Sequence, residues 1–239
     1  MKRSNGFIYV TALLFLLAGC GKPVSVMVIT GGHSYDTTEF VDLFHSMADV
    51  EFDTAIYPAA KDILSSEQWL KYDVLLFYDF LHQMPQKDSV VFLKLMEQGK
   101  SLLFLHHALG TSQRWDGYKQ MVGGKYVMPQ YGADSTLLSD YRHDIDMMVE
   151  VVDPEHPVTW NMSDFEIHDE GYSNVSMVEG VVPLLKTAHP DCSPVVGWTK
   201  LSGQSTVVYL MLGHDQLAYA NESFQQLLSN SIHWLASEN

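Results

Sequence analysis

Four histidines stand at the exits of three apolar runs that have the length of a β-strand. They are His33 after residues 24–30, His106 and His107 after residues 101–105, and His214 after residues 206–212. Imidazole titrates near neutral pH and is the commonest metal ligand among side chains, so such a group can serve proton transfer or metal binding. One histidine at a strand end often only caps the backbone. Four at matched positions favour a common site.

A second group of polar side chains lies within residues 164–172. It contains His168, Asp169, Glu170 and Tyr172. A carboxylate beside an imidazole can orient the ring, accept a proton or bind sugar hydroxyls. The alternative is a solvated acidic loop, but the apolar residues interspersed here favour partial burial.

The elements that must position these groups alternate between strands and helices. Apolar runs of this kind are typical of parallel strands covered on both faces, and helical spacing predicts helices between them. The expected strands are 24–30, 72–78, 101–105 and 206–212, and the expected helices include 85–98 and 222–237. This alternation predicts an α/β fold with a doubly wound, mostly parallel sheet and helices on both faces. Ligands of such sheets bind beyond the carboxyl ends of the strands, where the histidines would meet.

The second half of the chain is less regular. Residues 112–121 predict a short helix that carries Trp115, and residues 125–139 show no period. A stretch of that length without periodicity is usually functional or mobile. Alternation predicts a strand at 145–151, and further strands are expected at 181–187 and 194–199.

The first residues are typical of an export signal. Lys2 and Arg3 precede an apolar stretch at residues 7–17, and small residues lead to Cys20. Residues 1–19 are therefore expected to be a lipoprotein signal peptide, 20–23 a lipid-anchored linker, and 24–239 a single domain. Lipidation of Cys20 would attach the protein to the bacterial cell envelope, either in the periplasm or at the surface. The alternative is an ordinary signal peptide with an incidental cysteine.

Charge and motif content exclude several classes of function. The formal net charge is −15, which argues against a nucleic-acid partner and against docking on anionic lipid through basic residues. With Cys20 acylated, Cys192 stands alone, so no internal disulfide is expected. The sequence has no P-loop, dinucleotide fingerprint, G-x-S-x-G elbow, HExxH or CxxC. The oligomeric state is left open.

The ordered set of short motifs resembles one known family. The motifs are Gly31-Gly32-His33, Leu105-His106-His107-Ala108, Trp115 with Gly123-Gly124, residues 153–157 with their His-Pro, Asp169-Glu170 with Tyr172, Pro194-Val195 with Trp198, and Leu212-Gly213-His214-Asp215. Together they resemble the trehalose-utilisation (ThuA-like) family over residues 24–236. The resemblance implies a flavodoxin-like sheet of the class I glutamine-amidotransferase superfamily.

The resemblance also implies what the site should and should not do. True amidotransferases carry a cysteine nucleophile at the elbow after the central strand, where this chain has His106 and His107, so it is not expected to hydrolyse glutamine. The family often has a histidine where this chain has Met128 and Pro129. The implied substrates are carbohydrates, particularly disaccharides or their 3-keto derivatives.

Three hypotheses follow for the activity. In the first, a sugar-processing enzyme, His106 and His168 exchange protons, Glu170 orients or acts as base, and His214 with Asp215 polarises a hydroxyl or carbonyl. Trp115 or Tyr172 would stack on the sugar ring, with His33 and His107 as further contacts. In the second, the protein binds a sugar without changing it. In the third, it is a metal-dependent hydrolase, with a divalent metal held by His33, His106, His168 or His214.

Overall fold

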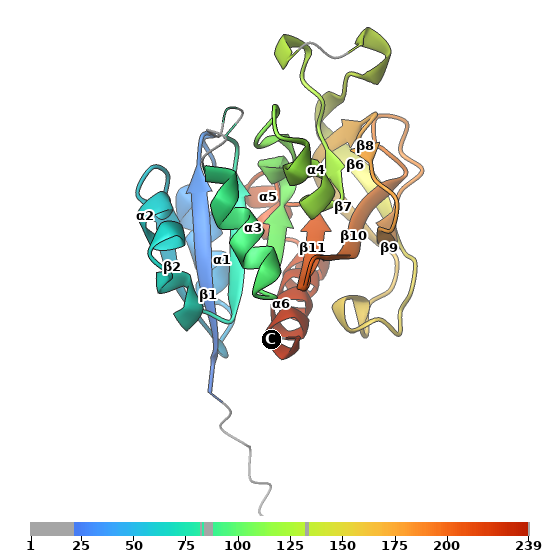
Figure 1. The fold of residues 1–239 in the computed structure, drawn as a ribbon. Helices are drawn as coiled ribbons and strands as arrows, with labels where there is room; N and C mark the ends of the chain where they lie inside the picture. The colour runs from blue at the N-terminus through green and yellow to red at the C-terminus, as the bar shows by residue number, and fades with distance from the viewer. Residues whose placement is uncertain (1–21, 82, 84–87, 132–133, 239) are drawn as a thin grey trace, which may run out of the picture.

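A nine-stranded sheet forms the centre of the molecule (Figure 1). The computed structural model describes residues 22–81, 83, 88–131 and 134–238. The strands of the large sheet are β1 (Val24–Gly31), β2 (Val50–Ile56), β3 (Val74–Asp79), β4 (Ser101–Leu105), β6 (Asp140–Val151), β7 (Phe165–Ser173), β9 (Val182–Lys186), β10 (Val195–Ser202) and β11 (Ser205–Leu210). A small two-stranded sheet pairs β5 (Gly124–Lys125) with β8 (Ser176–Met177).

The large sheet has a parallel part and an antiparallel part. Its order is β2-β1-β3-β4-β11-β10-β9-β6-β7. The first five strands are parallel and the last four are joined antiparallel. In the parallel part, the strands lie side by side in the order 2-1-3-4-5 when they are numbered along the chain. This is the order of flavodoxin-like sheets, as predicted. The antiparallel strands widen the sheet next to β11.

Helices cover both faces of the parallel part (Figure 1). The α-helices of the described residues are α1 (Thr37–His45), α2 (Ala60–Ser65), α3 (Ser89–Glu97), α4 (Asp116–Val122), α5 (Gln216–Tyr219) and α6 (Glu222–Ser237). Helices α1, α5 and α6 pack together on one face, and α3 and α4 lie on the other. Helix α6 has the predicted bounds because the side chain of Asn221 accepts hydrogen bonds from the first turn, at the backbone N–H groups of Ser223 and Phe224.

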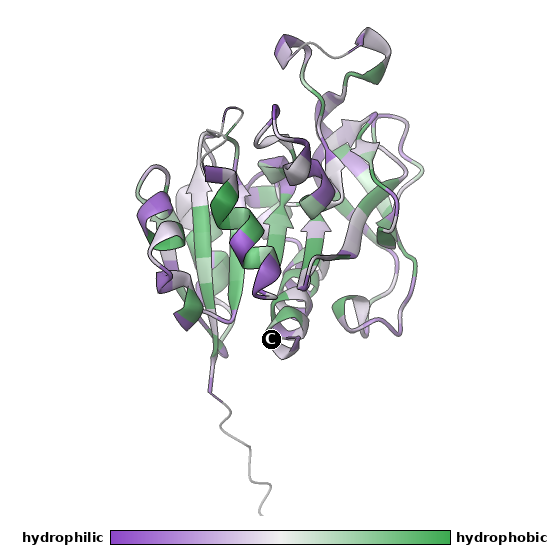
Figure 2. Ribbon diagram, viewed as in Figure 1, coloured by the Kyte–Doolittle hydropathy of each residue, from purple (hydrophilic) through white to green (hydrophobic). Residues whose placement is uncertain are grey.

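The central strands are buried on both faces, which explains their unbroken apolar sequences. Every residue of β3 and β4 is buried, and Figure 2 shows hydrophobic residues concentrated in these strands. Because both faces are dry, polar side chains can enter only where the strands end. The predicted position of the histidines beyond the carboxyl ends follows from this burial.

The structure departs from the sequence-based expectation in strands β6 and β7. β6 begins at Asp140 instead of Ile145, because a register shift between Arg142 and Ile145 breaks the alternation that marks a strand. Asp144 lies inside this bulge with φ +54°. Residues 165–173, expected only as a polar segment, form β7 and pair with β6 along its length.

Two predictions for the amino terminus concern the signal peptide and the lipidated cysteine. The signal peptide and Cys20 lie outside the described residues. Within the described ranges, every helix is too short or too polar to cross a bilayer.

Candidate functional site

The histidines from the strand ends converge in one place, as the sequence predicts. The ring of His33 lies 4.8 Å from that of His107 and 6.2 Å from that of His214, measured between centroids. The ring of His106 lies 5.4 Å from that of His107 and 5.0 Å from that of His214. The carboxyl ends of β1, β4 and β11 therefore deliver four imidazoles to one crevice.

His106 occupies the elbow directly after the central strand. It is the first residue of the short 3-10 helix η3 (His106–Gly110) and has φ +47°. Residues other than glycine rarely adopt this backbone conformation. The Nδ1 atom of His106 lies 2.6 Å from the carbonyl oxygen of Met211. The hydroxyl of Tyr209 donates a hydrogen bond to the backbone carbonyl of His106 at 3.0 Å. Since a carbonyl can only accept, Nδ1 carries a proton. The Nε2 atom is thereby fixed to face the centre of the cluster.

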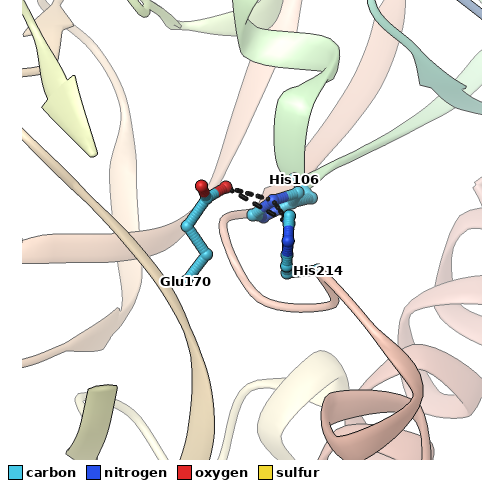
Figure 3. Close-up of side chains that lie close together, drawn as sticks. All are labelled: His106, Glu170 and His214. Carbon is cyan, nitrogen blue, oxygen red and sulfur yellow. Dashed lines mark hydrogen bonds and ion pairs between the residues drawn. The ribbon is translucent and has the colours of Figure 1, made fainter. Parts of the chain in front are cut away.

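Three polar groups approach this Nε2 atom, and Figure 3 shows two of them, Glu170 and His214. An Oε2 of Glu170 lies 2.9 Å away, Nδ1 of His214 lies 3.0 Å away, and the hydroxyl of Tyr172 lies 2.8 Å away. With Nδ1 protonated, a neutral His106 would point a lone pair at a carboxylate, which is repulsive. The Tyr172 hydroxyl or a protonated Nδ1 of His214 can donate to this lone pair, and a bound cation would relieve the repulsion between Nε2 and Glu170 directly.

The electrostatics of Glu170 and His214 indicate a charged pair. Burial would raise the pKa of the Glu170 carboxyl, but hydrogen bonds and positive charge from His106 and His214 lower that pKa well below its usual value. Burial likewise opposes a charge on His214, yet the neighbouring Glu170 raises the pKa of the His214 ring above 6.5. The lowered pKa of Glu170 and the raised pKa of His214 agree with each other. Glu170 is thus an anion that stabilises positive charge on its neighbours.

His143, which the sequence reasoning missed, completes the surroundings of Glu170. Its Nδ1 lies 3.1 Å from Oε1 of Glu170, and its ring centroid lies 4.9 Å from that of His214. It comes from the bulge in β6, on the antiparallel side of the crevice. No strand-exit pattern precedes it in the sequence, so only the spatial pairing of β6 with β7 could reveal it.

The other two histidines form an uncharged wall. Partial burial lowers the pKa of His33. Burial lowers the pKa of His107 well below 6.5, and the weak opposing effect of the Tyr78 backbone does not offset it. These two rings are therefore neutral at pH 7.

A cavity of about 210 Å³ is lined by His33, His107 and His143 together with Glu170, and it meets the His106–His214 pair through Glu170. This volume is below the ~300–1,000 Å³ typical of sites for drug-sized ligands, so a small ligand fits best. Most of the wall is aromatic or imidazole, and among the described lining residues there is no lysine or arginine. The lining residues are His33, Phe80, His107, Gly110, Tyr126, Met128, Tyr141, His143, Glu170 and Tyr172.

Three of the expected site residues lie elsewhere. His168 is one-third exposed and pairs with Asp146 at 2.8 Å, outside the cavity, so the geometry does not support proton exchange with His106. Trp115 packs against Phe92 and Tyr118 behind the elbow. Asp215 accepts hydrogen bonds from the first turn of α5 and acts as its cap. Their residue types fitted the expected chemistry, but packing and capping account for their positions.

Three side chains of the cluster are close enough together to share one metal ion. His106, Glu170 and His214 each place one ligand atom so that all three atoms lie within 4.8 Å of one another. His106 has the usual arrangement of a metal-binding histidine, with one ring nitrogen hydrogen-bonded to a carbonyl and the other directed at the site. Two imidazoles and a carboxylate are the donors of many catalytic zinc sites and of non-haem iron sites.

Fold and site together define an α/β protein with a histidine–carboxylate pocket beyond its parallel strands. The family model described as ThuA, trehalose utilisation, matches residues 25–235, and the chain belongs to this family. The expected family membership is thereby confirmed. No curated protein matches the chain.

Solved structures support the same fold. A ThuA-like protein from Parabacteroides merdae ATCC 43184 is 16% identical with a TM-score of 0.76, over 90% of this chain and 91% of that one. A ThuA-like protein from Bacteroides uniformis ATCC 8492 is 19% identical with a TM-score of 0.67, over 92% and 94%. PurLQS from Thermotoga maritima is 12% identical with a TM-score of 0.56, over 90% and 100%. These structures share the α/β fold of this chain, in which His106 occupies the elbow after β4.

Proposed function

We propose that this ThuA-family protein binds a divalent transition metal through His106, Glu170 and His214 and acts on a small carbohydrate in the adjoining cavity. The observation that carries the proposal is the contact of Nε2 of His106 with the Glu170 carboxylate at 2.9 Å, while Nδ1 is committed to a carbonyl. A metal ion removes this conflict between two acceptors. It also uses the negative charge of Glu170, which the two histidines stabilise.

A carbohydrate is the substrate class that the pocket and the family together favour. The family model is described by trehalose utilisation. Aromatic rings of Phe80, Tyr126 and Tyr141 can pack on the apolar face of a sugar, and neutral imidazoles can pair with its hydroxyls. The cavity volume favours one sugar ring over two. Because the described lining contains Glu170 and no basic side chain, an uncharged sugar fits better than a phosphorylated one.

The groups around the cavity suggest acid–base chemistry at a hydroxyl or carbonyl. A bound metal would polarise that oxygen as a Lewis acid. Glu170, Tyr172, His33 and His107 all line the cavity in which that oxygen would lie. His143, which is half-exposed and contacts Glu170, also lines the cavity. His168 takes no part.

We also propose that the protein is an envelope lipoprotein anchored through Cys20. The support is the sequence of the first twenty residues, in which a basic start, an apolar stretch and small residues precede the cysteine. An acidic protein of this kind needs acyl chains for stable attachment, because it has little basic surface to hold it on anionic lipid.

Metal content gives the first test. Protein prepared without a chelator or an affinity tag should contain about one transition-metal ion per chain, as a single three-ligand site requires. His106→Ala and His214→Ala should lose that ion, whereas His168→Ala should keep it because His168 lies outside the cluster. Elemental analysis by mass spectrometry measures this. Metal-free wild-type protein that also fails to take up Zn²⁺, Mn²⁺, Fe²⁺ or Co²⁺ would overturn the metal site.

Turnover gives the second test. Metal-loaded protein is incubated with uncharged monosaccharides, disaccharides and their 3-keto derivatives, and products are analysed by chromatography and mass spectrometry. We expect turnover that stops on metal removal and returns on reloading. Binding without any product would favour the alternative of a sugar-binding lipoprotein.

A further inference from the structure

We propose that Asp169, Tyr78 and Tyr219 form a clamp on residues 213–214, and that this clamp sets the position of His214 and with it the metal affinity of the site. The inference rests on the proposed function and assigns a positioning role to residues that do not line the cavity. Asp169 is its main member. It lies next to Glu170 in β7 and is only 2% exposed.

The carboxylate of Asp169 holds the N–H side of the loop after β11. Its Oδ2 accepts a hydrogen bond from Gly213 N at 2.7 Å, and its Oδ1 accepts one from His214 N at 2.9 Å. The same Oδ1 accepts from Glu170 N at 2.8 Å. Hydrogen bonds to an ionised acceptor are stronger than neutral ones. One carboxylate therefore ties together the backbone of two metal ligands.

Two tyrosine hydroxyls hold the carbonyl side of the same loop. Tyr78 donates to the carbonyl of Gly213 at 2.8 Å, and Tyr219 donates to the carbonyl of His214 at 3.1 Å. The two hydroxyl oxygens are 2.8 Å apart. The N–H and C=O groups of both loop residues are thus held by side chains from β7, β3 and α5. No backbone polar group of residues 213–214 is left to water.

The conformation of the loop explains why a clamp is useful. Gly213 has φ +103°, and a Cβ atom there would lie 2.7 Å from the ring of Phe224. A glycine in this conformation has many alternatives in a free loop, so the loop sequence does not fix the direction of the His214 ring. Burying a carboxylate is costly unless it is fully hydrogen-bonded. The three N–H bonds to Asp169 satisfy that requirement and fix the loop.

The test replaces the carboxylate by an amide of the same shape. In Asp169→Asn, the amide nitrogen must face the N–H of Gly213 or of His214, so at least one bond is lost. We expect Zn²⁺ or Co²⁺ affinity to fall about 10–100-fold, the usual effect of removing a group that orients a metal ligand. The matched control is Asp146→Asn, an exposed acid on the neighbouring strand β6, which should bind the metal like the wild type. Metal titration is done well below the thermal midpoint of each variant.

A second readout separates this inference from the proposed function. Imidazole ¹⁵N NMR signals of the metal-free protein report the position of His214 directly. They should shift in Asp169→Asn and stay unchanged in Asp146→Asn. If the wild type binds no metal, the proposed function fails, while these signals still decide whether the clamp exists.

The outcomes are distinct. Unchanged metal affinity and unchanged His214 signals in Asp169→Asn, even with a lower melting temperature, would show a purely structural role and overturn the inference. If Asp169→Asn does not fold, Tyr219→Phe replaces it, because it removes one neutral hydrogen bond from the carbonyl side. A smaller loss of affinity of about 2–10-fold, with shifted His214 signals, is then expected. Wild-type values for Tyr219→Phe would count against the clamp.

Discussion

Asp79 is a carboxyl group buried at the end of β3, close behind the cavity wall. Its Oδ2 accepts a hydrogen bond from the Thr111 hydroxyl at 3.2 Å, and its Oδ1 has no hydrogen-bond partner among the described residues. Burial raises the pKa of this carboxyl from 3.8 to about 7, and the bond from Thr111 only partly opposes the rise. Its ionisation near neutral pH therefore costs stability.

The pH dependence of stability follows from this pKa. The unfolded chain releases the Asp79 proton near pH 4, whereas the folded protein keeps it up to about pH 7. Stability thus falls as pH rises through that window and changes no further above it. In Asp79→Asn this contribution is absent. The variant should gain up to about 3 kcal/mol relative to wild type between pH 5 and pH 8, at about 1.36 kcal/mol for each pKa unit.

Denaturant unfolding of both proteins at pH 5 and pH 8 measures this change. Asp62→Asn, an exposed acid on α2, serves as the control and should track the wild type. An Asp79→Asn difference that is the same at both pH values would show that Asp79 does not titrate in this window.

Single residues show where sequence reasoning about the site succeeds and fails. The sequence could predict the four histidines at strand ends, because a buried strand excludes polar side chains until it ends. These residues are His33, His106, His107 and His214. His168 has the same residue type but no such constraint, and it turns to the exposed Asp146 instead.

At the scale of elements, η3 forms both the elbow and one wall of the cavity. Gly110 ends this 3-10 helix and lies against the ring of Phe80. A Cβ atom on Gly110 would lie 2.1 Å from Cε2 of Phe80. The close approach of the helix to this ring leaves no space for a larger residue. The width of the cavity therefore depends on glycine at this position.

Gly110→Ala should push the Phe80 ring toward the cavity. We expect a loss of about 1–3 kcal/mol in stability, as for other overpacked sites, and a higher KM for the sugar. Metal content should stay unchanged, because neither residue is a ligand. Thermal unfolding, elemental analysis and steady-state kinetics measure the three effects.

Gly180→Ala is the control for the Gly110 prediction. Gly180 has φ +81° but no atom near its Cβ position, so the substitution should cost backbone strain alone and leave KM as in the wild type. An unchanged KM in Gly110→Ala would mean that the ligand does not use the part of the cavity beside Phe80.

Elements differ in how far the sequence predicts them. The central strands and α6 have bounds close to those expected, because unbroken apolar runs and a polar cap leave little choice. The start of β6 was predicted five residues late, since its first half carries exposed polar residues and a bulge. His143 lies in that half. The sequence could not predict that His143 belongs to the site, because only the antiparallel pairing of β6 with β7 brings it there.

At the scale of the whole molecule, the cavity and the start of the domain lie at opposite ends of the sheet. The chain enters β1 at Val24 and reaches the histidine cluster at its far end (Figure 1). Eight residues of strand span about 26 Å at ~3.3 Å per residue. If Cys20 carries the proposed lipid, the cavity faces away from the membrane surface. The ligand would then be taken from the surrounding compartment and not from the bilayer.

Cys20→Ser tests this arrangement. We expect the wild-type protein to sediment with membranes and to incorporate a labelled fatty acid, because acyl chains on Cys20 would hold a chain whose net charge of −15 gives it little attraction to anionic lipid. The variant should lose the label and move to the soluble envelope fraction. Its metal content and sugar kinetics should match the wild type, since the described chain enters β1 at Val24, at the end of the strand remote from His33. A variant that stays with the membranes would place the attachment elsewhere on the protein, and one that loses its metal would show that the two ends of the sheet are not independent.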